Sequence, residues 1–551
     1  MGGVQLPSSK SQNYLHGAAI MTVAVAIIKI LGAIYRIPLG NILGEVGFAH
    51  FNVAHNLFSV LLTLSTAGLP IALAKLISEE VNSLDRLRQV RKIFRVALTA
   101  FVVLGGAGTI LMFIFPTQLA DFMGDIYSSM SILVLAPSVL LVCIMSAFRG
   151  YTQGFSDMRP TSISQIIEVA VKVAFGLSAV MILQRRGAGM PILSAGAISG
   201  VAAGSIVACL YMSLVAKKRM NFENIRALEK GSVNERDMEG TGTVLKRLAK
   251  IGAPIALGAS VLSVITLINT ILVLSRLQDA AGFTFLDAKI MFGAYSMALT
   301  LFNLPAAIIT PLTISIVPAI AGFIASKKFS EAKDVIESSL RIATVIALPM
   351  AVGLSVLSGP IMSGIYYGRA QQQGPMLLAI LGVASFFVCL ALITTAILQA
   401  GGRERLPMYT MLFGGIVNIV LNWFLLGIPY INIFGAPLGT LACYILMSGL
   451  NLYFIMSRLP ERPKLGNIFF KPAFSCIIMA FVAWLVYPAM IYVLRAGPAP
   501  GRLMILIAMS AAIGAAAFVY FALIIITRTI TMDDMKLVPK GEKLGKLLRI
   551  R

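Results

Sequence analysis

The stretch LLAILGVASFFVCLALITTAIL, residues 377–398, contains no charged residue. An α-helix rises about 1.5 Å per residue, so a run of this length covers the roughly 30 Å hydrocarbon core of a bilayer. The run shows no alternation of apolar and polar residues, and it is too long for a strand of a membrane barrel. It therefore predicts a transmembrane helix.

The rest of the chain repeats this pattern. Of the 551 residues, 58% are apolar and only 12% are charged, whereas about a quarter of the residues in a soluble protein are charged. This composition excludes a soluble single domain and predicts an all-α polytopic membrane protein with about 14 transmembrane helices. The predicted spans are 15–39, 48–74, 93–115, 126–148, 161–183, 192–215, 250–275, 290–323 (broken by three prolines), 342–366, 375–399, 407–428, 434–456, 472–494 and 503–527.

The net charge of +22 follows the predicted topology. Of the 45 basic residues, 35 fall in the N-terminal arm, the even-to-odd connections or the C-terminal tail, and seven fall on the opposite side. Basic loops favour the cytoplasmic side, which predicts that both termini are cytoplasmic. Since the basic residues are spread over every cytoplasmic loop, anionic membrane lipids are expected partners and nucleic acid is not.

Prolines indicate an internal repeat. Pro318 follows Pro70 by 248 residues, and Pro407 follows Pro160 by 247 residues. Near-equal offsets predict two six-helix bundles, with chance placement of prolines as the alternative because residue identity between the halves is thin. The predicted divisions are an N-terminal bundle at 1–215, a cytoplasmic connector at 216–249, a C-terminal bundle at 250–456, two additional helices at 457–527 and a basic cytoplasmic tail at 528–551.

Enzyme motifs are absent from the sequence. There is no GxxxxGK[ST] phosphate loop and no HExxH motif, and the five cysteines and three histidines form no metal-binding pattern. A membrane-bound polysaccharide ligase or polymerase would need a large outer loop, but the predicted outer loops are short. The sequence therefore predicts a transporter without catalytic residues, metal or other cofactor, and it leaves open coupling to Na⁺, H⁺ or the membrane potential.

Ionisable residues within predicted spans are candidates for the substrate site, because a charge near the bilayer centre is costly unless it faces water or a partner. Lys29 lies about 21 Å along the first span, and Arg36 lies two turns further on nearly the same face. Glu168 and Lys172 are spaced to pair across one helical turn. The predicted substrate-binding residues are Lys29, Arg36, His55, Glu168, Lys172 and Arg276. The predicted polar cavity lining is Gln165, Asn269, Asn303, Gln399 and Asn418.

Structural roles compete with substrate binding for several of these residues. Arg36 can extend to the outer interface, the two charges of the fifth span can neutralise each other, and His55 can be a hydrogen-bonded core residue. Lys29 is the hardest to explain in this way, because no acidic residue of its own helix lies one turn away. A cavity with net positive charge suits an anionic substrate such as a diphosphate.

Three segments carry a family resemblance. Residues 149–173, RGYTQGFSDMRPTSISQIIEVAVKV, closely resemble a segment of the polysaccharide-transporter branch of the multidrug/oligosaccharidyl-lipid/polysaccharide exporter superfamily. Residues 29–38, KILGAIYRIP, are similar to its first-helix motif, and residues 65–70, STAGLP, to its second-helix ending. The particular likeness is to stage V sporulation protein B and to lipid II flippases. The motif residues Arg149, Gly150, Gln153, Gly154 and Pro160 are expected in a structural or gating loop outside the bilayer.

The resemblance implies a V-shaped pair of bundles in a bacterial plasma membrane that alternates between inward-open and outward-open states. Its implied cargo is an undecaprenyl-diphosphate-linked saccharide, above all the peptidoglycan precursor lipid II, moved to the outer leaflet for cell-wall synthesis. By the same likeness, Lys29 faces the diphosphate and the last two spans form a groove for the polyprenyl tail. Arg36 sits one residue later than the second basic position of the Gram-negative pattern.

Two functional alternatives stay open beside this implication. The first is a cation-coupled multidrug exporter of the same superfamily, which would more naturally carry acidic residues in its cavity, and the second is a flippase for another lipid-linked polysaccharide. The sequence leaves open whether the protein serves growth or sporulation. A monomeric transporter is expected.

Overall fold

The computed structural model describes residues 9–80, 87–228, 239–368, 370–458, 462–494 and 501–529. Throughout these ranges the regular elements are helices, and no strand occurs in them. Thirteen segments are long and apolar enough to cross a membrane, and the first of them, Ile27–Glu80, has 54 residues. That first segment is long enough for two crossings. The predicted all-α, multi-pass membrane architecture with about fourteen spans is confirmed.

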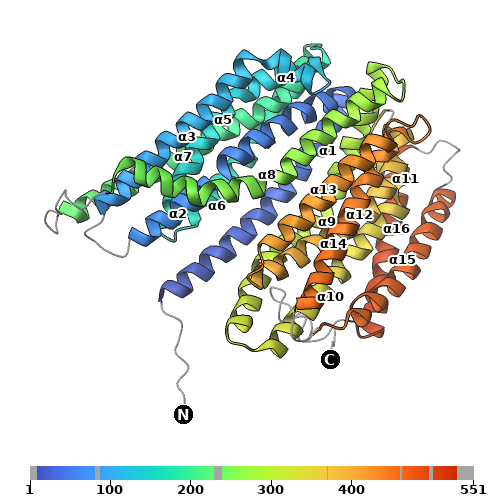
Figure 1. The fold of residues 1–551 in the computed structure, drawn as a ribbon. Helices are drawn as coiled ribbons and strands as arrows, with labels where there is room; N and C mark the ends of the chain where they lie inside the picture. The colour runs from blue at the N-terminus through green and yellow to red at the C-terminus, as the bar shows by residue number, and fades with distance from the viewer. Residues whose placement is uncertain are drawn as a thin grey trace. The chain divides into compact units, whose positions relative to one another are not determined.

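The chain divides into two compact units. Unit 1 comprises Met1–Tyr35 and His50–Ile271, and unit 2 comprises Arg36–Ala49 and Leu272–Arg551. The described elements of unit 1 are most of α1 (Ser9–Thr66), α2 (Leu69–Glu80), α3 (Leu87–Ile114), α4 (Pro116–Phe122), η2 (Ile126–Ser128), α5 (Ser129–Gly154), α6 (Arg159–Arg185), α7 (Met190–Leu228) and the first part of α8 (Thr241–Asp279). Figure 1 labels the α-helices.

Helix α1 reverses direction within its length. Gly44 has a φ of 59° and a ψ of −171°, a left-handed backbone that glycine adopts without steric cost. The rings of Tyr35 and Phe51 lie 6.2 Å apart, although sixteen residues of straight helix would separate them by about 24 Å. The two arms of α1 therefore run back along each other, and they account for the first two predicted spans.

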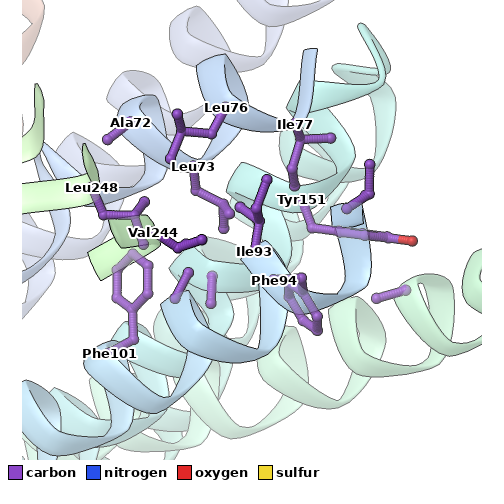
Figure 2. Close-up of a cluster of buried hydrophobic side chains, with 14 of the residues drawn as sticks. Ala72, Leu73, Leu76, Ile77, Ile93, Phe94, Phe101, Tyr151, Val244 and Leu248 are labelled. Carbon is purple, nitrogen blue, oxygen red and sulfur yellow. The ribbon is translucent and has the colours of Figure 1, made fainter. Parts of the chain in front are cut away.

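The core of unit 1 is an apolar cluster between α2, α3, α5, α7 and the start of α8. Figure 2 shows Leu73 and Ile77 of α2 with Phe94 of α3, Tyr151 of α5 and Val244 of α8. Burial of such side chains stabilises a helical unit through close packing, which remains available in lipid. This cluster holds the motif-bearing end of α5 against α2.

The glycines of the predicted gating loop lie in a helix, because residues 149–154 form the last turns of α5. A Cβ atom on Gly150 would lie 2.8 Å from the carbonyl oxygen of Pro70, and one on Gly154 would lie 2.6 Å from the Ile77 side chain. The expectation of a loop was wrong. The motif glycines let α5 approach α2 closely, which fits the structural reading of the motif.

A second glycine stripe joins α6 to α7. Gly196, Gly200 and Gly204 follow each other at four-residue spacing along α7, so they share one face of the helix. A Cβ on Gly200 would lie 2.5 Å from the carbonyl oxygen of Lys172, and one on Gly204 would lie 2.3 Å from that of Glu168. The stripe therefore sets the position of two candidate charged residues.

Replacing Gly204 with leucine is expected to push α6 away from α7 and to destabilise the protein by about 1–3 kcal/mol, the cost of an overpacked helix contact. Thermal unfolding in detergent would measure this loss. The matched control is Gly106→Leu, because a Cβ at Gly106 of α3 has nothing within 4 Å. Equal unfolding temperatures for the two variants would contradict the role of the stripe.

Unit 2 contains the remaining helices and the bend of α1. Its described elements are the second part of α8, α9 (Phe285–Ala325), α10 (Phe329–Val356), α11 (Ser358–Ile365), α12 (Ala370–Ala400), α13 (Arg405–Leu425), η4 (Asn432–Phe434), α14 (Gly435–Arg458), α15 (Leu465–Val493) and α16 (Arg502–Ile526). Its apolar core draws on α9, α10, α12, α14 and α15. Helices α15 and α16, which are the last two predicted spans, pack side by side (Figure 1).

One detail of unit 2 differs from expectation. Helix α9 is continuous through Pro305, Pro311 and Pro318, whereas the sequence predicted a broken segment. After the bend of α1, the chain passes from unit 1 to unit 2 between Ile271 and Leu272, within α8; the predicted connector is 216–249. Much of that connector is helical, because α7 extends to Leu228 and α8 begins at Thr241. The predicted domain boundaries stay predictions.

Candidate substrate-binding site

Tyr35 joins the first arm of α1 to α6 and α7. Its hydroxyl donates a hydrogen bond of 2.7 Å to the carbonyl oxygen of Ala197 on α7, and its side chain is fully buried. The same hydroxyl lies 2.7 Å from where a Cβ on Gly176 of α6 would stand. The absence of a side chain at position 176 therefore makes room for the tyrosine, which fixes the first arm within unit 1.

Two predicted basic residues lie close to this tyrosine. The ammonium of Lys172 is 5.4 Å from the centre of the Tyr35 ring, at a distance typical of a cation–π contact. Lys29 precedes Tyr35 by six residues on the same arm, or about 9 Å along the helix, and its side chain is exposed. The structure thus brings the Lys172 ammonium to the arm that carries Lys29.

His55 lies in a row of aromatic rings on the second arm of α1. Its ring stacks on Phe51 at 5.8 Å with an interplanar angle of 16°, and it lies 6.4 Å from the ring of Phe58. Phe51 in turn contacts Tyr35. This packing supports the reading of His55 as a core residue, and its role in substrate binding stays a prediction.

Glu168 forms an ion pair with a residue of another helix. The guanidinium of Arg149, on α5, donates a hydrogen bond of 2.9 Å to the Glu168 carboxylate and another of 2.9 Å to the hydroxyl of Ser164. The side chains of the pair are only 12% and 24% exposed. The sequence suggested Lys172 as the partner of Glu168, one turn away. Arg149 was missed as a partner because it comes from a segment expected outside the bilayer.

The other motif residues also contact α6. Gln153 of α5 donates a hydrogen bond of 3.3 Å to the hydroxyl of Thr161, and Pro160 is buried in the first turn of α6. Gln165 is half-buried on the same helix. The motif therefore fixes the start of α6, the helix that presents Glu168 and Lys172.

Arg36, which directly follows Tyr35, and Arg276 belong to unit 2. The Arg276 guanidinium stacks 4.3 Å from the ring of Trp423 on α13 and donates a hydrogen bond of 3.1 Å to its carbonyl oxygen, which is a structural contact between α8 and α13. Arg36 is half-buried near the bend of α1. Burial raises the pKa of the Tyr366 hydroxyl, and the charge of Arg36 partly opposes that rise.

The predicted polar lining is distributed over several helices. Asn418 is buried at the contact of α13 with α14, where it accepts a hydrogen bond of 3.2 Å from Asn422. Asn303 donates a hydrogen bond to a carbonyl oxygen one turn earlier in α9. Asn269 is half-buried on α8, and Gln399 is exposed on α12. A shared role in lining a cavity stays a prediction for all of them.

Among the described residues, no group of three or more histidine, cysteine, aspartate or glutamate side chains is placed to hold a metal ion.

The comparison with known families decides the assignment. The model of a family described as "Polysaccharide biosynthesis protein" matches residues 14–324, which is more than half of the chain, and the MatE family model matches residues 254–424. The chain belongs to the polysaccharide biosynthesis protein family. The resemblance inferred from the three sequence segments is confirmed.

Relatives from Bacillus subtilis (strain 168) match over most of their length. The chain is 27% identical to "Uncharacterized membrane protein YabM" over 97% of this chain and 96% of the relative. It is 24% identical to "Stage V sporulation protein B" over 96% and 98% of the two chains. It is also 24% identical to "Lipid II flippase MurJ" over 79% of this chain and 81% of that protein.

Solved structures share the fold. A lipid II flippase MurJ in an inward closed conformation aligns with a TM-score of 0.66 and 17% identity, covering 92% of this chain and 98% of that one. An inward-facing multidrug resistance MATE family transporter of the MOP superfamily aligns with a TM-score of 0.59 and 14% identity, covering 79% and 97%. Together with the two family matches, the relatives and the membrane-spanning helices, this fold makes the protein a multi-pass membrane transporter of this superfamily, related to flippases and multidrug exporters.

Proposed function

We propose that the protein flips an undecaprenyl-diphosphate-linked saccharide, most specifically lipid II, from the inner to the outer leaflet by alternating access. The relationship to a lipid II flippase, over 81% of that protein's length, supports this proposal. Under this proposal the protein acts as a monomer in a bacterial plasma membrane. Both of its termini lie in the cytoplasm, which the distribution of basic residues favours.

One observation carries the proposal, namely the charge of the cluster around Tyr35 in unit 1. The Glu168 carboxylate is bound by Arg149, so these two charges cancel. Among the four residues Lys29, Arg149, Glu168 and Lys172, three carry a positive charge and one carries a negative charge. Lysine is a common binder of phosphate groups in proteins, and a diphosphate carries the complementary charge.

A cation-coupled multidrug exporter is the second candidate. The match to the MatE family and the likeness to MATE transporters favour it. A site for cationic drugs needs acidic side chains, and the acidic residue of this cluster, Glu168, is already bound by Arg149. The charge of the cluster therefore favours an anionic cargo over a cationic one.

Expression in a strain depleted of its lipid II flippases tests the two candidates together. The proposal predicts restored growth and cell-wall synthesis, without raised resistance to cationic drugs. Drug resistance without restored growth would favour the exporter. Rescue of a different lipid-linked polysaccharide pathway, without rescue of peptidoglycan synthesis, would keep the flippase mechanism and change its cargo.

A further inference from the structure

The end of α11 and the residues after it contact two parts of unit 2 that are distant in sequence. We call residues 364–368 the latch segment; it begins in the last turn of α11 and leads towards α12. The bend of α1 forms hydrogen bonds with this segment, and so does the first residue of α16. These contacts lie entirely within unit 2.

Asn41 and Glu45 make the contacts of the α1 bend. The Asn41 amide donates a hydrogen bond of 2.8 Å to the carbonyl oxygen of Ile365 and accepts one of 3.1 Å from the backbone N–H of Tyr367. The Glu45 carboxylate accepts a hydrogen bond of 2.5 Å from the backbone N–H of Ala370, the first residue of α12. A negative charge is favourable at that end of a helix.

The packing around the bend leaves little free space. A Cβ on Gly293 of α9 would lie 2.1 Å from the carbonyl oxygen of Glu45, and one on Gly40 would lie 2.9 Å from the ring of Tyr366. Tyr366 is completely buried. Because the α1 bend fits closely against α9 and the latch segment, it is held in one position in this conformation.

Arg502, the first residue of α16, contacts the same segment. Its guanidinium donates hydrogen bonds of 2.7 Å to the carbonyl oxygens of Gly364 and Ile365, and it stacks 3.9 Å from the ring of Tyr367. The last carbonyl groups of a helix have no partners within it, so a charged donor there is a strong cap. The carbonyl oxygen of Ile365 therefore accepts from both Asn41 and Arg502, using its two lone pairs.

We propose that Arg502 is a positioning residue through which α16 holds the bend of α1, and that this latch opens during the transport cycle. Residues 36–49 belong to unit 2, while the two arms of α1 that flank them belong to unit 1. A change of state that moves the units must therefore act on this bend. The proposal gives α16, which lies outside the predicted twelve-span repeat, a part in conformational change, and it does not depend on which cargo is carried.

Hydrogen–deuterium exchange on the purified full chain tests the link from α16 to α1. In Arg502→Ala, exchange in peptides covering 36–49 is expected to rise about tenfold, because the bend loses a support that Arg502 provides only through the latch segment. Arg528→Ala is the matched control, since Arg528 is an exposed arginine just beyond the opposite end of α16.

The double variant sharpens this test. Asn41 and Arg502 share one carbonyl oxygen. The fold increase in the exchange rate at 36–49 in Asn41→Ala/Arg502→Ala should therefore be much smaller than the product of the fold increases in the two single variants. Faster exchange confined to 364–368, an unchanged rate at 36–49, or fully multiplicative effects would each overturn the role of Arg502.

A cross-link tests whether the latch must open. In a variant without the five native cysteines, Asn41→Cys and Tyr367→Cys would be joined by a short bis-methanethiosulfonate reagent, and lipid II flipping measured in proteoliposomes. Flipping should stop and return on reduction, while the control pair Ser131→Cys/Ser194→Cys, whose native hydroxyls lie 3.1 Å apart in unit 1, stays active. If the cross-linked protein still flips lipid II, the proposal that the latch opens during the transport cycle is wrong. Absence of flipping by the wild-type protein in the same proteoliposomes would instead contradict the proposed cargo, and the exchange test would still decide the role of Arg502.

Discussion

Lys29→Ala is expected to reduce complementation of a flippase-depleted strain by roughly thirtyfold or more, while the amount of protein in the membrane stays unchanged. Removing one member of a desolvated, hydrogen-bonded charge pair costs about 2–5 kcal/mol, and every 1.4 kcal/mol is a factor of about ten. In the proposed mechanism the pair is the Lys29 ammonium and the substrate diphosphate. The Lys29 side chain is exposed, so its removal leaves no cavity in the core.

Two further variants complete this prediction. Lys29→Arg keeps the charge and should retain part of the activity, whereas a residue needed only for packing would not respond to charge in this way. Lys218→Ala removes an exposed lysine of α7 in the same unit and should behave as the wild type. Full complementation by well-expressed Lys29→Ala would exclude this residue from the mechanism.

Arg149→Ala is expected to destabilise the protein by about 2–4 kcal/mol, because it leaves the partly buried Glu168 carboxylate without its cationic partner. Thermal unfolding in detergent would measure the loss. Adding Glu168→Gln should recover much of it, since the amide carries no charge to be compensated.

The control for this pair is Arg159→Ala, because Arg159 is an exposed arginine in the first turn of α6, the helix that carries Glu168. If Arg149→Ala lowered the unfolding temperature no more than Arg159→Ala, the ion pair would contribute nothing measurable. Failure of Glu168→Gln to restore stability would show that Arg149 acts through Ser164 or through packing.

The helices could be predicted because the signal for each span is local. A run such as 377–398 has the length and apolarity to cross a bilayer wherever its neighbours lie, and it falls within α12. The glycine stripe of α7 was also readable, since Gly196, Gly200 and Gly204 repeat at four-residue spacing. Charged residues do not mark this contact, because close helix contacts in membranes depend on small residues.

The pairing of the charges could not be predicted from the sequence. The spacing of Glu168 and Lys172 within one helix suggested a pair, but the carboxylate is bound by Arg149 from α5, a contact that depends on how α5 and α6 pack. The bend at Gly44 and the hydrogen bonds of Asn41 to residues more than three hundred positions away are likewise tertiary features. Lys29, by contrast, could be identified as a candidate from the sequence, because a charge within an apolar run is a local property.

The most direct test of the central claim is the amount of lipid II exposed at the outer surface of flippase-depleted cells that express this chain. The account predicts that wild-type protein restores surface-exposed lipid II and that Lys29→Ala, present at the same level, does not. An unchanged amount of surface lipid II with well-expressed wild-type protein would contradict the proposed cargo.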